Sequence, residues 1–263
     1  MAETTMSDPH LPPEILDYVI DLLRNELETL KQCCLVSRSW VPRTRIHLFA
    51  DIKFRSASDL ESWMKTFPDV TNSPAHHAHT LFVGCPRHVV AADAEDGGWI
   101  RAFSGVKCLD TDNGDQFLEV FEVSLAPFYN FSPTLKSLRI SPIHFPFPQV
   151  FDLIFSFPLL EDLSLKGYDQ LWLVDLDPNG PQTAIPSTSP VFTGSLDFHV
   201  LGGGMKAARP LLNLPNGLHF RNLALSWDCR DDFQRITEFV TRCSHTLESI
   251  DITYTFRSTS ICI

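Results

Sequence analysis

The chain has 263 residues, 44% of them hydrophobic, and a formal net charge of −11 at pH 7. This length suffices for one large or two small domains with a buried core. The negative charge disfavours nucleic acids and anionic membrane surfaces as partners, because both bind through positive side chains. No apolar run approaches the roughly 18 residues that span a bilayer, and the acidic start is unlike a signal peptide. We therefore expect a cytoplasmic or nuclear protein with no nucleic-acid or membrane partner.

The first predicted elements are three short helices. Residues 1–10 are polar and are expected to form a disordered tail. Prolines followed by Glu14 suit a helix N-terminus, because proline pre-sets φ and an acid faces the positive end of the helix dipole. Apolar residues then recur at helical spacing. The sequence predicts a helical module over 11–54, with helical patterns in 11–23, 27–40 and 41–49 before a strand-like 51–54.

Both ends of this module carry a family signature. Residues 11–16 read L-P-P-E-I-L, and residues 34–40 read C-L-V-S-R-S-W. Together, and at this separation, they resemble the F-box, whose pattern opens with Leu-Pro-x-Glu-Ile/Leu and closes with Leu/Cys-Val-Ser/Cys-Arg-x-Trp. The continuation at 42–49 is similar to the form found in mushroom-type fungi. Ser37 stands where many members have Cys, and both residues are small.

The resemblance implies that the module docks to the Skp-type adaptor of a Skp–cullin–F-box ubiquitin ligase, through apolar side chains laid into a groove. Some of these side chains must instead form the module's own core. From periodicity alone, the alternative remains that the helices simply cap the larger body. By analogy with the family, the adaptor-binding residues are Leu11, Pro12, Ile15, Leu16, Val19, Leu35, Val36 and Trp40.

A short pattern repeats through the rest of the chain: an apolar residue, two variable positions, then apolar–x–apolar. Its marker residues follow one another at intervals of 28, 29, 25, 33, 27 and 27. This spacing is similar to that of leucine-rich repeats, which are strand-and-return units of about 20–29 residues. The chain lacks the Asn/Cys ladder position of strong repeats, and a plain α/β domain with coincidental spacing remains the alternative. The marker residues are Leu81, Leu109, Leu138, Leu163, Leu196, Leu223 and Ile250.

The predicted fold is therefore α/β: a three-helix F-box followed, over 55–263, by an irregular leucine-rich-repeat solenoid with a curved parallel sheet. An uncapped solenoid exposes apolar surface at its end. The sequence reaches residue 263 just after a repeat strand, without a polar cap. Our hypothesis is that the solenoid is truncated there or that a partner packs against its end.

Positions beside the markers alternate to the other face of the sheet. We expect this face to form a mixed-charge, acid-leaning surface that binds a protein target, whereas the plainer alternative is a solvated polar face. The candidate target-binding residues are Asp110, Asp112, Arg139, Asp162, Lys166, Asp197, His199, Asn222 and Asp251.

Motifs for catalysis, metals and cofactors are weak, and we expect none of the three. The segment 76–88 is rich in potential zinc ligands but has no Cys-x-x-Cys pair. Residues 110–115 resemble a calcium loop whose glycine falls one position early. Neither a nucleophile elbow nor a His-Glu-x-x-His motif is present. A hydrolase would have to be assembled from residues far apart in the sequence.

The leading hypothesis is therefore a substrate-recognition adaptor of a ubiquitin ligase. The helical module would bind the Skp-type adaptor and through it a cullin, and the solenoid would bind an unidentified protein target. Such a protein contributes proximity and leaves bond-making to other subunits. The alternative is an interaction scaffold that works without a ligase.

Overall fold

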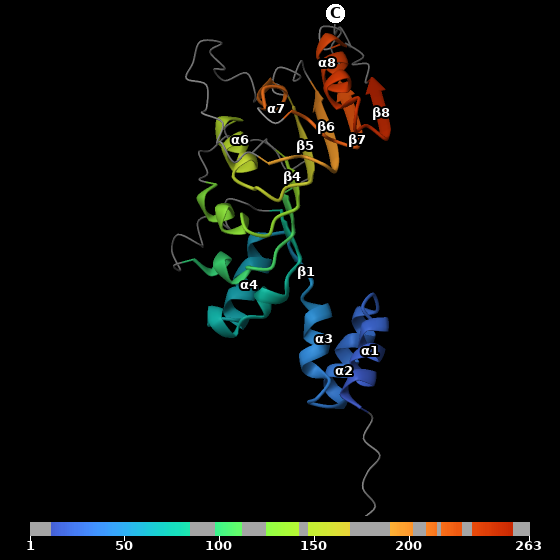
Figure 1. The fold of residues 1–263 in the computed structure, drawn as a ribbon. Coiled ribbons are helices and arrows are strands. Elements are labelled where there is room, and N and C mark those ends of the chain that lie inside the picture. Colours follow the sequence, from blue (N-terminus) through green and yellow to red (C-terminus); the bar gives the residue numbers. More distant parts are fainter. Residues whose placement is uncertain are drawn as a thin grey trace, which may run out of the picture. The chain divides into compact units, whose positions relative to one another are not determined.

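The computed structural model divides the chain into two compact units, Met1–Asp51 and Ile52–Ile263 (Figure 1). The expected tail at 1–10 lies outside the residues that the structure describes. The described residues are 12–84, 98–111, 125–141, 147–168, 190–201, 209–214, 217–227 and 233–254.

The first unit, called here the helical unit, consists of three short helices around a small core. Prolines stand in the first turns of the first and third helices, where a missing N–H costs no helical hydrogen bond. The buried residues Ile20, Leu30, Cys33 and Thr44 form the core. The helices are α1 (Pro13–Leu22), α2 (Leu27–Val36) and α3 (Val41–Leu48).

One carboxylate ties α1 to α3. Asp21 on α1 accepts a hydrogen bond from Nε of Arg43 at 2.6 Å and lies 2.7 Å from Nε2 of His47, both on α3. The hydrogen bond from Arg43, followed by the contact with His47, lowers the pKa of Asp21 to about 2. The helical unit is therefore held by this ion-pair cluster as well as by its few buried apolar side chains.

The second unit, called the strand unit, is built on an open eight-stranded parallel sheet whose strands lie in chain order, β1 to β8. Strand β1, which we had grouped with the helical module, is the first strand of this sheet: the backbone N–H of Gly84, just after β2, donates to the carbonyl of Phe54 at 2.7 Å. The strands are β1 (Asp51–Phe54), β2 (Thr80–Val83), β3 (Cys108–Thr111), β4 (Ser137–Ile140), β5 (Asp162–Tyr168), β6 (Ser195–Leu201), β7 (Asn222–Trp227) and β8 (Ser249–Tyr254).

The marker residues of the repeat stand side by side across this sheet. Leu81 pairs with Leu109, Leu109 pairs with Leu138, and the same register continues through every following strand to Ile250. The expectation of a parallel sheet is confirmed. Because side chains alternate along a strand, this register puts all the markers on one face.

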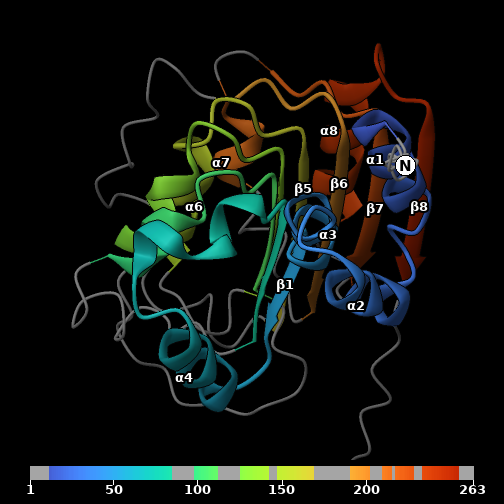
Figure 2. The same ribbon diagram turned by 90° about the horizontal axis from the view of Figure 1, so that it is seen from below.

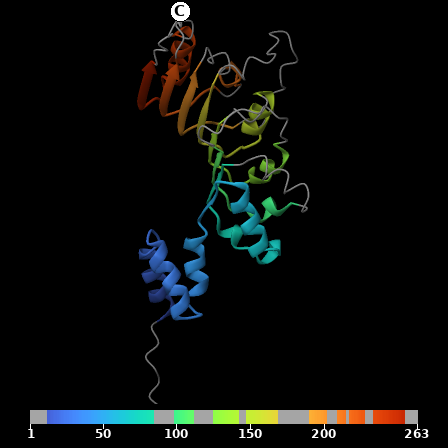
Figure 3. The same ribbon diagram turned by 180° about the vertical axis from the view of Figure 1, so that it is seen from behind.

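The segments between strands return along that face as helices and short 3-10 turns (Figures 2 and 3). Helix α4 begins with a capping box, in which Ser56 and Asp59 satisfy each other's backbone N–H groups. The returning helices are α4 (Ala57–Thr66), α6 (Phe147–Phe155), α7 (Arg209–Leu212) and α8 (Phe233–Cys243). The turns are η1 (Val70–Asn72), η2 (Pro74–His77), η3 (Trp99–Ala102) and η4 (Ala126–Phe131).

The core of the strand unit lies between the marker face and these returns, and its two ends differ. At the β1 end, the rings of Trp63, Trp99 and Phe103 surround that of Phe54, with centroids 5.7–6.1 Å away. At the other end, Ile250 on β8 is 44% exposed, whereas the markers of β2 to β7 are buried. Apolar surface is therefore open at the last described strand, while residues 255–263 lie outside the described part.

Candidate functional site

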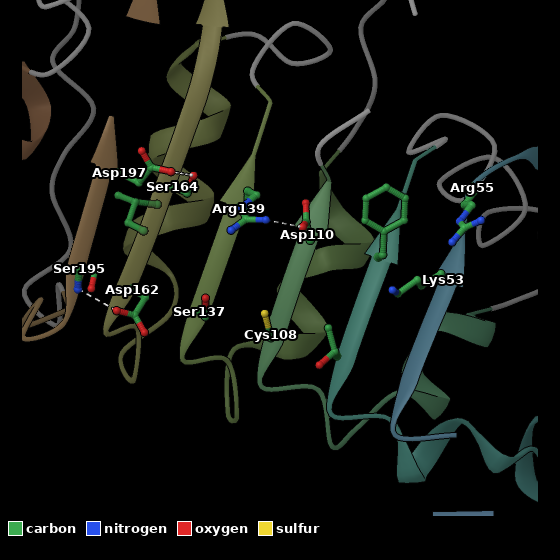
Figure 4. Close-up of a pocket in the computed structure, with 13 residues that line it drawn as sticks. Lys53, Arg55, Cys108, Asp110, Ser137, Arg139, Asp162, Ser164, Ser195 and Asp197 are labelled. Carbon is green, nitrogen blue, oxygen red and sulfur yellow. Dashed lines mark hydrogen bonds and ion pairs between the residues drawn. The ribbon is translucent and has the colours of Figure 1, made fainter. Parts of the chain in front are cut away.

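The face of the sheet opposite the markers carries a hollow of about 710 Å³, which we call the polar groove (Figure 4). It extends over the first six strands, and strand alternation supplies nearly all of its lining. The lining residues are Lys53, Arg55, Thr80, Phe82, Cys108, Asp110, Ser137, Arg139, Asp162, Leu163, Ser164, Ser195 and Asp197.

An ion pair spans the middle of the polar groove. Asp110 on β3 and Arg139 on β4 are register partners in adjacent strands. Nη1 of Arg139 lies 3.1 Å from Oδ2 of Asp110, so each side chain offsets the charge of the other. Partly exposed pairs of this kind contribute little stability, but they hold the long Arg139 side chain in one position.

Two carboxylates mark the end of the groove at β5 and β6. Oδ1 of Asp162 accepts a hydrogen bond from the backbone N–H of Ser195 at 2.7 Å. The approach is close because residue 194 is glycine: a Cβ atom there would lie 2.4 Å from Oδ1 of Asp162. The absence of a side chain at Gly194 therefore allows the carboxylate to bridge from β5 to the start of β6.

Asp197 is the second carboxylate, and its neighbours keep it ionised. Burial alone would raise its pKa, but the close contact with His199 and the hydrogen bond from Ser164 hold the pKa of Asp197 below its usual value. Oγ of Ser164 donates to Oδ2 of Asp197 at 3.0 Å, and Nε2 of His199 lies 2.6 Å from Oδ1.

This order of groups does not activate a nucleophile. Catalytic triads place the imidazole between the hydroxyl and the carboxylate, so that the ring accepts the hydroxyl proton. Here Asp197 lies between Ser164 and His199. The arrangement presents a fixed negative charge to the groove.

The β1 end of the groove has the opposite charge. Lys53 and Arg55 both line it and are exposed. Within the part of the chain that the structure describes, neither side chain has an ion-pair partner. We did not predict either residue as a site residue. The signal in the sequence was the alternation of polar and apolar residues over 51–54, which is typical of a half-buried strand.

The structure brings part of the predicted target-binding set together. Asp110, Arg139, Asp162 and Asp197 line the polar groove. Asp112 lies outside the described residues. Four others stand at positions of the same face, outside the groove lining: Lys166, His199, Asn222 and Asp251.

A second candidate site lies on the helical unit. Ile15, Tyr18, Val19 and Leu22 are all exposed and follow one another at i, i+3, i+4 and i+7, so they form one stripe on α1. On α2, Leu27, Leu35 and Val36 are exposed too, with Leu35 reaching 80%. We call these seven side chains the apolar helical surface. An apolar stripe left exposed along a helix is unusual on a monomer and typically marks a binding site.

The predicted adaptor-binding residues are largely available at the surface. Pro12, Ile15, Val19, Leu35 and Val36 are exposed. Leu16 and Trp40 are partly buried, and Leu11 lies outside the described residues. Tyr18, Leu22 and Leu27 were not predicted, although their helical spacing from the predicted positions could have identified them.

No protein-family model matches this chain, and neither a curated protein nor a solved structure matches it. Over the described ranges, no group of three or more His, Cys, Asp or Glu side chains is placed to hold a metal ion. Among the helices that the structure describes, none has the length and apolar character needed to cross a membrane.

Proposed function

We propose that this protein is a substrate-recognition adaptor of a Skp–cullin–F-box ubiquitin ligase. The helical unit, with its resemblance to the F-box, docks to the Skp-type adaptor. The strand unit acts as an irregular leucine-rich-repeat solenoid and offers the polar groove to a protein target. Ubiquitin transfer belongs to other subunits, and this chain supplies proximity between them and the target.

The observation that carries the proposal is the exposure of the apolar helical surface. Leu35 and Val36 belong to the Cys-Leu-Val-Ser-Arg-x-Trp end of the motif, and they are 80% and 67% exposed at the end of α2. Full burial of a Val or Leu side chain is worth roughly 1.5–3 kcal/mol. A partner that covers several of these side chains therefore gains a substantial driving force for binding, which the isolated unit leaves unused.

Co-purification tests this assignment. The full chain should capture a Skp-type adaptor, and the double variant Leu35→Ser/Val36→Ser should lose that capture while keeping its circular dichroism spectrum. The matched control is Leu159→Ser/Val191→Ser, which removes two exposed apolar side chains from the strand unit. This control should capture the adaptor as the unmodified chain does.

Failure of the unmodified chain to capture the adaptor would contradict the ligase assignment. If the chain still bound a target through the polar groove, the ligase-independent scaffold would then be the better description.

A further inference from the structure

The charges that line the polar groove are separated along its length. Lys53 and Arg55 give the β1 end two positive charges. The central pair of Asp110 and Arg139 is neutral as a unit. Asp162 and Asp197 are the acidic side chains of the β5–β6 end, and His199, 2.6 Å from Asp197, stands outside the lining. The lining itself therefore carries two cations at one end and two carboxylates at the other.

The neutral centre of the groove offers contacts of a different kind. Phe82 on β2 lines it between the cationic end and the central ion pair and is partly exposed. Small side chains, such as those of Ser137 and Ser195, line the strands further along. A ligand that crosses the groove thus meets cations, then an aromatic ring, then a fixed ion pair, then carboxylates.

The length of the groove sets the length of its ligand. From β1 to β6 there are five strand intervals. With neighbouring strands about 4.8 Å apart, these intervals cover about 24 Å. An extended peptide advances about 3.4 Å per residue, so about seven residues cross this distance.

Resting on the proposed function, we infer that the target segment bound in the polar groove is an extended peptide with its charges separated. An acidic side chain lies over Lys53 and Arg55, and a basic side chain lies over Asp162 and Asp197, about six or seven positions away along the peptide. Nucleic acids and anionic lipid surfaces fit poorly, because the carboxylate end repels phosphates.

Selection of random dodecapeptides displayed on phage, against the immobilised full chain, tests the inference. The enriched peptides should carry an acidic and a basic residue separated by about six or seven positions. A synthetic peptide of an enriched sequence should bind at least about tenfold more tightly than the same composition with its charges interleaved.

Reversing the charges at the β1 end of the groove tests whether that end binds the acidic residue of the peptide. With Lys53→Glu/Arg55→Glu, the acidic preference should disappear from the selected peptides while the basic one remains. The matched control is Lys65→Glu/Arg101→Glu, which reverses two exposed cations on α4 and η3, outside the groove lining. This control should select the same peptides as the unmodified chain.

Absence of any enriched peptide, or enrichment without charge separation, would overturn the inference. So would a selection unchanged by reversal of Lys53 and Arg55. Adaptor capture is a separate measurement, because it depends on the apolar helical surface. If the chain captures the adaptor but enriches no charge-separated peptide, only this inference is contradicted. If it enriches such peptides but does not capture the adaptor, only the ligase assignment is contradicted.

Discussion

The helical unit and the strand unit use apolar side chains in opposite ways. The strand unit buries most of them: Phe128 and Phe239 are fully buried against the marker face, and the opposite face is largely polar. The helical unit buries few residues and exposes an apolar stripe along α1. The chain therefore presents two different surfaces. Binding to the apolar helical surface is favoured by an apolar partner, and binding to the polar groove is favoured by a charged one.

The largest effect is expected in the core of the strand unit. Leu138→Ala removes a fully buried marker side chain from the middle of the sheet. Such a change costs about 2–5 kcal/mol of unfolding free energy, because it removes buried apolar contacts and leaves a cavity. Urea unfolding measures it, with Leu159→Ala, exposed at the surface, as the control that should change stability by less than about 0.5 kcal/mol.

A pair of substitutions in α1 separates core packing from surface exposure. Ile20 is 1% exposed and Ile15 is 48% exposed, although both belong to α1. Ile20→Ala should destabilise the helical unit by about 2–4 kcal/mol, because it empties a small core. Ile15→Ala should leave the unfolding free energy within about 0.5 kcal/mol and weaken adaptor capture instead. Equal losses of stability in the two variants would show that the α1 stripe is part of the core.

The sequence predicts the features that a repeated pattern encodes better than those that a few residues encode. Seven repeats placed the markers in register, because a repeat of nearly constant length that is buried on one face leaves little freedom to slip. Strand β1 has only four residues and no preceding marker, so the sequence places it, and Lys53 with it, in the helical module over 11–54. Arg55 follows directly after the strand and was not predicted as a site residue either. The role of Gly194 could not be predicted, because it depends on an approach between residues of two strands.

A smaller effect is expected at the polar groove. Gly194→Ala would place a Cβ atom 2.4 Å from Oδ1 of Asp162 and 2.9 Å from the carbonyl oxygen of Glu161. We expect a loss of about 1–3 kcal/mol in unfolding free energy, as for other overpacked positions. The double variant Gly194→Ala/Asp162→Ala should recover part of this loss, because the nearest atom is then removed. No recovery would mean that the carboxylate is not the main obstacle.

The smallest effect concerns acid stability. The pKa of Asp21 is lowered to about 2 in the folded helical unit, below the ordinary value of 3.8. Its ion-pair cluster therefore stabilises the unit above pH 4, and this contribution is lost as pH falls from about 4 to 2. Because the side chains are partly exposed, we expect about 1 kcal/mol or less. In the Asp21→Asn variant, the unfolding free energy of the helical unit should fall less between about pH 4 and 2 than in the unmodified chain. An equal fall in both would contradict the stabilising role of Asp21.

Hydrogen exchange of the full chain, with and without a Skp-type adaptor, tests whether the adaptor docks on α1 and α2. We expect the adaptor to slow amide exchange in α1 and α2, where the apolar helical surface lies, and to leave exchange in the strands that line the polar groove unchanged. Protection in those strands, or no protection of the two helices, would contradict it.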